Sequence, residues 1–203
     1  RNGGVTVTGG EPMMQMDFLI ELFRDLKRNH IHTCIDSSGI MFNPHSERFM
    51  TQLAELLALT DLVLLDIKHI SDVKHQSLTG HSNRQILAFA RHLDEQGIPV
   101  WIRHVVVPGI TLYREYLEGL GTFMASLHNV QALDVLPYHT LGKVKYEKLG
   151  LPYPLEEPVK PQRRRPPLPA RSSWRRTKRQ NCAKFRTSLS LVYLQLLYYY
   201  MYK

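Results

Sequence analysis

Short apolar runs alternate with longer amphipathic segments throughout residues 5–137, and this alternation limits the fold more than any other feature of the chain. Two of the apolar runs, 61–68 and 98–109, are hydrophobic over most of their length, as strands covered on both faces are. Between the runs, hydrophobic residues recur every three or four positions, which indicates helices. We therefore predict an α/β protein with a parallel sheet, built from about five strand–helix repeats.

The predicted elements follow one another with short links. We expect strands at 5–8, 31–36, 61–68, 98–109 and 130–137, and helices at 16–30, 46–60, 83–97 and 113–127. In the first helix, the spacing predicts one buried face made of Phe18, Leu19, Leu22, Phe23 and Leu26. Ser46 and Asn83 are predicted to cap the amino ends of their helices, and Gly97 is predicted to stop the third helix.

The net charge of +8 comes entirely from the C-terminal residues. Residues 1–161 carry 18 acidic and 15 basic residues and net −3, whereas residues 162–203 carry the other 11 basic residues and no acid. The run QRRRPPLPARSSWRRTKRQ is broken by prolines and cannot bury enough apolar surface to fold alone. We expect one domain at 1–161 and a basic, disordered tail at 162–203 that results from a shift in the reading frame. A basic arm for nucleic acid or anionic membrane is the alternative.

Two cysteines, Cys34 and Cys182, provide neither a disulfide framework nor zinc-ligand spacing, which fits a reducing cytoplasm. We expect Cys34, inside a predicted strand, to pack as a small buried residue. No apolar run reaches the roughly 20 residues of a membrane-spanning helix. Nine histidines lack metal-ligand spacing and are each expected at the surface or at a helix cap: His30, His32, His45, His69, His75, His81, His92, His104 and His128.

Polar or glycine groups follow almost every predicted strand. They are Gly9-Gly10-Glu11-Pro12, Asp36-Ser37-Ser38-Gly39, Asp66-Ile67-Lys68 and Pro137-Tyr138-His139, with Arg103-His104 inside the fourth strand. Because ligands gather at the carboxyl ends of parallel strands, these groups predict a binding site there. The simpler alternative is that loops begin with polar residues because they are solvated. It is weaker for Lys68 and Arg103, which lie in apolar runs where an unpaired cation is costly.

The Gly9-Gly10 pair would let the backbone approach a ligand closely, but it matches neither the phosphate-binding loop nor the dinucleotide-binding fingerprint. Taken in order, six segments resemble the pyruvate formate-lyase activating enzymes, a family of radical S-adenosylmethionine (SAM) proteins. The segments are GGVTVTGGEP, HTCIDSSG, LVLLDIKHI, LTGHSN, WIRHVVVPGIT and LPYHTLGKVKYEKLG. The resemblance extends from about residue 3 to Pro161. It implies a partial (β/α) barrel of the radical SAM type that here lacks its first βα unit.

The resemblance also implies residue roles. The SAM-binding residues would be Gly9, Gly10, Glu11, Asp36, Ser37, Asp66, Lys68 and His139, and the catalytic positions Lys68, Arg103 and His139. The Gly-Gly-Glu motif would meet the amino group of SAM, largely through backbone atoms. Asp36 and Ser37 match an Asp-Thr pair that, together with Asp66, holds a monovalent cation beside the SAM carboxylate. Such a mixture suits SAM, which carries a carboxylate, an amine and a sulfonium.

The implied activity is reductive cleavage of SAM by a [4Fe–4S] cluster, after which the resulting radical removes a hydrogen atom from one glycine of pyruvate formate-lyase. The electron donor would be a flavodoxin or a ferredoxin-type protein. Cluster thiolates come in this family from C-x-x-x-C-x-x-C, a motif that the 203 residues do not contain, so we expect this chain alone to be inactive.

We further expect a cytoplasmic monomer without nucleic-acid or membrane partners. Two rival hypotheses belong to other classes of protein. One is a non-catalytic α/β module that binds a partner, and the other is a nucleic-acid binder that acts through its basic tail.

Overall fold

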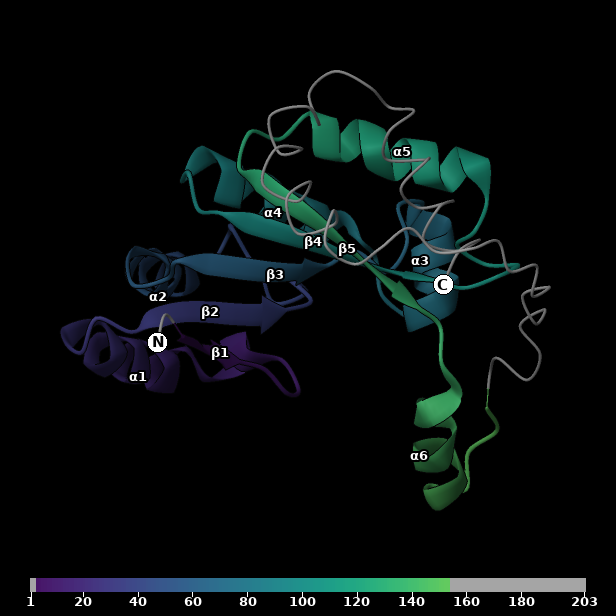
Figure 1. The fold of residues 1–203 in the computed structure, drawn as a ribbon, viewed down its shortest axis with the longest axis horizontal. Coiled ribbons are helices and arrows are strands. Elements are labelled where there is room, and N and C mark those ends of the chain that lie inside the picture. The colour runs from purple at the N-terminus through teal and green to yellow at the C-terminus, as the bar shows by residue number, and fades with distance from the viewer. Residues whose placement is uncertain (1–2, 154–203) are drawn as a thin grey trace, which may run out of the picture. The chain divides into compact units, whose positions relative to one another are not determined.

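The computed structural model of the chain describes residues 3–153 (Figure 1). In order, its elements are β1 (Gly4–Val7), η1 (Pro12–Gln15), α1 (Met16–Arg28), β2 (His32–Ser37), α2 (Glu47–Ala58), β3 (Leu62–Asp66), α3 (Asp72–Thr79), α4 (Arg84–Glu95), β4 (Val100–Val106), α5 (Arg114–Ala125), β5 (Val130–Pro137), η2 (Thr140–Gly142) and α6 (Lys143–Lys148). The predicted 162–203 tail and Cys182 lie outside the described residues.

The strands form one sheet in the order β1-β2-β3-β4-β5, which is also their order in the sequence. Each of the pairs β1–β2, β2–β3 and β3–β4 is parallel, and at least one helix connects each strand of these pairs to the next. This arrangement confirms the predicted α/β class with a parallel sheet. All the predicted helices and strands are present, whereas η1, α3, η2 and α6 were not predicted.

Contacts group the chain into two compact units. The first contains described residues 3–104 and 123–134, and the second contains 105–122 and 135–153. β4 and β5 each contribute residues to both units. The residues predicted to bind SAM or to act in catalysis all lie in the first unit except His139, which lies in the second unit together with Pro137 and Tyr138 of the same strand-end group.

The core of the first unit lies on one face of the sheet. The register places Ile35, Val63 and Val100 side by side, and all three are almost fully buried. Residues one step along each strand point to the other face, where Leu64 is half-buried and Trp101 is 36% exposed. The buried face therefore packs against helices, while the other face stays more accessible.

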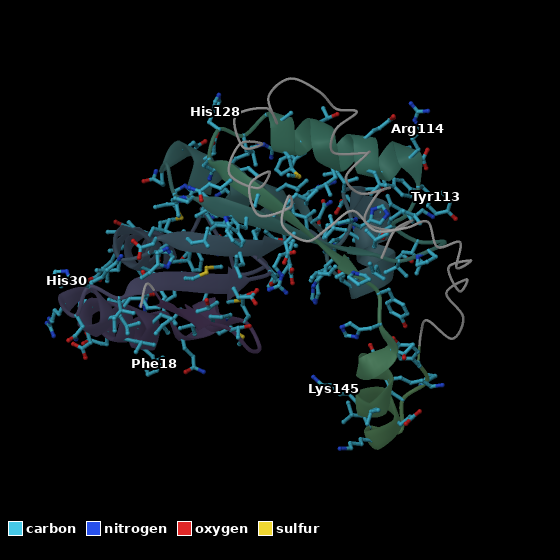
Figure 2. The ribbon with its side chains drawn as sticks, in the orientation of Figure 1. Phe18, His30, Tyr113, Arg114, His128 and Lys145 are labelled. Carbon is cyan, nitrogen blue, oxygen red and sulfur yellow. The ribbon has the colours of Figure 1, made fainter. Side chains whose placement is uncertain are left out.

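Helix α1 is amphipathic, but its buried face differs from the prediction. Met16, Leu19, Ile20 and Phe23 are buried, as their spacing of three and four residues requires. Phe18 is 60% exposed, and Figure 2 shows it on the outer side of the helix. The prediction was wrong for Phe18 because it is two residues from Ile20, about 200° around the helix.

The predicted helix ends are confirmed in part. The hydroxyl of Ser46 accepts a hydrogen bond from the amide of Phe49 at 3.3 Å and thereby caps α2. Gly97 follows α4 with a φ of +67°, the left-handed geometry expected of a stop signal. Asn83 occupies the N-cap position directly before α4, but its side chain makes no capping hydrogen bond, and its Nδ2 donates to the carbonyls of His69 and Ile70.

Three histidines contradict the prediction of surface or capping positions. His69, His75 and His104 are 1%, 2% and 3% exposed. His75 lies on the buried side of α3, which follows β3. Its Nδ1 lies 2.7 Å from the carbonyl of His81 in the loop after this helix. Nδ1 of His104 lies 2.7 Å from the carbonyl of Ile67, so a backbone carbonyl contacts one nitrogen of each ring, while Nε2 of each ring is buried without a hydrogen-bond partner among the described residues. Cys34, by contrast, is buried as predicted.

The second unit contains the ends of β4 and β5, most of α5, and α6. The amide of Tyr138 donates to the carbonyl of Val106, and its hydroxyl lies 2.5 Å from that of Tyr153. Desolvation and this contact raise the pKa of Tyr138 to about 12, so the phenol stays protonated. Among residues 3–153, no helix is long and apolar enough to cross a membrane.

Candidate functional site

Strands β2, β3 and β4, with the loop after β3, bring four charged side chains together. The guanidinium of Arg103 donates from Nη1 to Oδ2 of Asp36 at 2.6 Å, and its Nε lies 3.2 Å from Oδ1 of Asp66. Lys68 donates from Nζ to the other oxygen of Asp66 at 2.6 Å. Two carboxylates and two cations from three successive strands and their loops therefore form one network.

The sheet register explains why these groups meet. Asp66 on β3 lies directly beside Arg103 on β4, so their side chains share a face. Asp36 pairs with Leu64, which lies two residues before Asp66 and therefore on the same face. The hydroxyl of Thr8, just after β1, also donates to Asp36 at 3.0 Å and extends the network to the edge strand.

The network holds Arg103 as a permanent cation. Burial alone would lower the pKa of this guanidinium, but the charges of Asp66 and Asp36, with a contribution from Asp134, outweigh burial and raise it. The side chains of Arg103, Asp36 and Asp66 are only 22%, 16% and 14% exposed, so water screens these pairs less than it would at the surface.

A two-glycine turn stands next to this network. Gly9 and Gly10 have φ values of +98° and +58°, a region that glycine enters without steric cost. Both are exposed, and a Cβ added to either would meet no atom within 4 Å. The backbone amides and carbonyls of the turn are thus accessible to a ligand.

Glu11 follows the turn, and its carboxylate is fully engaged by the protein. Oε1 accepts from Oγ of Ser37 at 2.7 Å and from the amide of Met13 at 3.3 Å. Oε2 accepts from the amide of Ser38 at 3.0 Å and from its hydroxyl at 2.6 Å. The side chain of Glu11 therefore ties the loop after β1 to the end of β2.

Ser37 does not join Asp36 and Asp66 in one ligand set. It is 2% exposed, its hydroxyl donates to Glu11, and the same oxygen accepts from the amide of Gly39 at 2.9 Å. Neighbouring residues of a strand point to opposite faces, which separates its side chain from that of Asp36. Within residues 3–153, no group of three or more His, Cys, Asp and Glu side chains could hold a metal ion.

His139 belongs to the second unit, where it precedes η2 and is exposed. Thr8 contacts the site and was missed by the sequence predictions, whereas Ser38 was included in the polar group after the second predicted strand but was given no role of its own. The alternation Val5-Thr6-Val7-Thr8 could have indicated that Thr8 shares the face of Asp36. Nothing in the local pattern distinguishes Ser38 from any other loop serine.

The described residues do not fit an iron–sulfur cluster. Cys34 is their one cysteine, and it is 4% exposed within β2. Burial, and to a lesser degree the charge of Asp36, raise the pKa of its thiol, and this disfavours the thiolate form that binds metal. The described residues therefore cannot supply the several thiolates that a [4Fe–4S] cluster needs.

Comparisons with known proteins show which family the chain resembles. The chain is 52% identical over 159 residues to the pyruvate formate-lyase-activating enzyme of Streptococcus mutans, covering 78% of this chain and 60% of that protein. It is 54% identical over 154 residues to the enzyme of the same name from Staphylococcus epidermidis, covering 76% of this chain and 61% of that protein. The chain thus spans about three fifths of the length of these curated relatives.

The fold is similar to that of a solved domain of a pyruvate-formate lyase-activating enzyme from Bacteroides vulgatus. The TM-score is 0.62 at 23% sequence identity, over 93% of this chain and 95% of that domain. The model of the radical SAM superfamily matches residues 2–118, which include β1 to β4 and every site residue of the first unit. The chain therefore belongs to the radical SAM superfamily.

Proposed function

We propose that the chain binds SAM at the carboxyl ends of β1 to β4 and serves the activation of pyruvate formate-lyase. One observation carries the proposal: the network of Asp36, Asp66, Lys68 and Arg103 stands assembled beside an open two-glycine turn. The ammonium of an amino-acid ligand can pair with a carboxylate of this network, and the carboxylate of the ligand can pair with a cation of the network. The bound ligand then leaves the net charge of the network unchanged.

The residues that would hold SAM follow from this chemistry. Asp36 and the backbone of Gly9 and Gly10 would receive the amino group, and Lys68 would receive the carboxylate. Arg103 would keep the two aspartates neutralised and would face SAM or the substrate peptide. The role of His139 is proposed on family resemblance alone, since it belongs to the other unit.

The fit to a monovalent cation is poorer. Arg103 already pairs with both Asp36 and Asp66, and the hydroxyl of Ser37 is engaged by Glu11 and Gly39. We therefore assign no role to a cation in SAM binding.

When bound, SAM would supply the radical chemistry by which a glycine of pyruvate formate-lyase is activated. We propose pyruvate formate-lyase as the protein substrate, and a flavodoxin or ferredoxin-type protein as the source of the electron. The names of the curated relatives support the substrate, and the electron donor rests on the family resemblance.

Calorimetric titration of the 203-residue chain with SAM tests the proposal. The substitution Lys68→Gln should weaken SAM binding by about tenfold or more, because it removes a charge-assisted contact to the ligand carboxylate. Lys145→Gln on α6, labelled in Figure 2, is the matched control and should leave the affinity unchanged. Absence of SAM binding to the wild-type chain, or equal effects of the two substitutions, would contradict the proposal.

A second titration addresses the rival hypothesis of a non-catalytic module. The titrant is a peptide that carries the glycine loop of pyruvate formate-lyase, added with and without saturating SAM. If SAM and peptide share the site, SAM should change the peptide affinity. Equal peptide affinity in both conditions would favour a module that recognises its partner without SAM.

A further inference from the structure

The carboxylate of Glu11 has no acceptor position left for a ligand. An ionised carboxylate offers about four lone-pair directions. Four donors from the protein fill them: the Ser37 hydroxyl, the Met13 amide, and the amide and hydroxyl of Ser38. The side chain of Glu11 therefore acts on the protein itself, and only the backbone of the motif remains available to SAM.

The turn that Glu11 follows needs such a restraint. Gly9 and Gly10 make no side-chain contacts, both are exposed, and both adopt positive φ. Two consecutive glycines lose more conformational freedom on ordering than any other pair of residues. A turn held only by its own backbone would therefore present its amides and carbonyls in many directions.

The contacts of Glu11 fix the turn relative to the charged network. Through Met13 the carboxylate fixes the start of η1, and through Ser37 and Ser38 it fixes the residues that directly follow Asp36. Ser38 contributes most to this link because its amide and its hydroxyl both donate to Oε2. One carboxylate thus sets the position of the turn with respect to Asp36.

We propose that Glu11 and Ser38 are positioning residues for the amino-acid end of SAM, and that they act as a pair by holding the Gly9–Gly10 turn beside Asp36. The inference rests on the proposed function for the identity of the ligand. The pairing itself rests on the hydrogen bonds between the two residues.

The binding test compares two ligands that share the adenosine end. SAM carries the amino-acid end, and 5′-methylthioadenosine does not. Glu11→Ala, Glu11→Gln and Ser38→Ala should each weaken SAM by about tenfold or more and change the affinity for methylthioadenosine by less than about twofold. Glu11→Gln keeps the shape of the side chain but places an amide nitrogen against hydrogen-bond donors. It therefore breaks the hydrogen bonds without leaving a cavity, and it remains informative if Glu11→Ala fails to fold. The exposed Glu47 of α2 supplies the control Glu47→Gln.

Coupling between the residues gives the sharper outcome. The double variant Glu11→Ala/Ser38→Ala should bind SAM no more weakly than Glu11→Ala alone, because the two residues act through one link. Ser38→Thr keeps both donors and should recover most of the affinity lost in Ser38→Ala. Additive effects, or equal weakening of both ligands, would overturn the proposal.

Amide hydrogen exchange in the ligand-free chain tests the pairing without reference to SAM. Glu11→Ala should accelerate exchange of the Ser38 amide at least tenfold and leave the buried amides of α1 unchanged. Unchanged exchange at Ser38 would refute the pairing. If exchange responds but the wild-type chain binds neither ligand, the pairing stands and the proposed function fails.

Discussion

At the scale of single residues, charge neutralisation inside the sheet edge is the main organising effect. Arg103 is the one cation that contacts both Asp36 and Asp66 in the described structure, and both carboxylates are mostly buried. Removal of one partner from such a group leaves the others with a desolvation penalty that nothing offsets. The residue is therefore expected to support stability as well as ligand binding.

We expect Arg103→Gln to lower the free energy of unfolding by about 1–3 kcal/mol, since it removes charge-assisted contacts from partly buried carboxylates. Urea denaturation at pH 7 measures the change. Arg84→Gln is the matched control, because its Nε lies 3.4 Å from Asp72 but its side chain is 84% exposed. This control should lower the free energy of unfolding by less than about 0.5 kcal/mol. Equal costs would show that burial of the network contributes nothing.

His104 should make stability depend on pH. Burial is the main cause that lowers the pKa of this imidazole in the folded chain. Below about pH 6.5 the unfolded chain binds a proton at His104 that the folded chain resists, so stability falls as the pH drops through this range. Burial also lowers the pKa of His92, which therefore contributes to the pH dependence in the same direction.

We expect His104→Gln, which keeps a donor for the Ile67 carbonyl, to lose less stability than the wild type between pH 7.5 and 5.5. The difference should be up to about 1 kcal/mol, since each pH unit below the unfolded pKa contributes at most about 1.4 kcal/mol. Urea denaturation at both pH values measures it. The exposed His45 provides the control His45→Gln, which should follow the wild type. An identical pH response of His104→Gln would disprove this assignment.

At the scale of elements, one glycine determines how closely α4 packs on the sheet. A Cβ at Gly39 would lie 3.0 Å from Cδ1 of Leu65 and 3.1 Å from Cδ1 of Phe89. Leu65 and Phe89 are both fully buried, so neither can move away freely. The turn after β2 therefore has two requirements, a positive φ and the absence of a side chain.

We expect Gly39→Ala to lower the free energy of unfolding by about 2–4 kcal/mol. The positive φ accounts for about 1 kcal/mol of this loss, and overpacking against Leu65 and Phe89 accounts for the rest. Gly80→Ala separates these contributions, because Gly80 ends α3 at a φ of +79° with nothing within 4 Å of its Cβ position. That control should cost about 1 kcal/mol. Thermal and urea unfolding measure both. If the two variants were equally stable, close packing at Gly39 would be excluded.

At the scale of the whole molecule, residues 2–118 match the radical SAM superfamily, while the described residues hold no site for a cluster. The 203 residues contain two cysteines at unrelated positions. Anaerobic reconstitution of this chain with iron and sulfide should therefore give no stoichiometric [4Fe–4S] absorption or paramagnetic signal. A stoichiometric cluster would require a ligand set that the sequence does not indicate.

The sequence by itself determined the elements and their order, because each depends on local patterns. The apolar runs at 61–68 and 98–109 predicted β3 and β4, and the periodicity at 16–30 predicted α1, although Phe18 was assigned to the wrong face. The positions of Glu11 and Asp36 after predicted strands connected them with a binding site, and family resemblance identified the ligand as SAM. The placement of each polar group at a strand end then followed from the parallel order.

Only the tertiary structure decided which polar groups contact one another. Arg103 lies 67 residues from Asp36, and Ser38 lies 27 residues from Glu11, so no local pattern could report either contact. The burial of His104 and the engagement of the Ser37 hydroxyl are likewise consequences of packing between strands and loops. Periodicity records how each segment meets the core, whereas hydrogen-bond partners depend on where distant segments bring their side chains together.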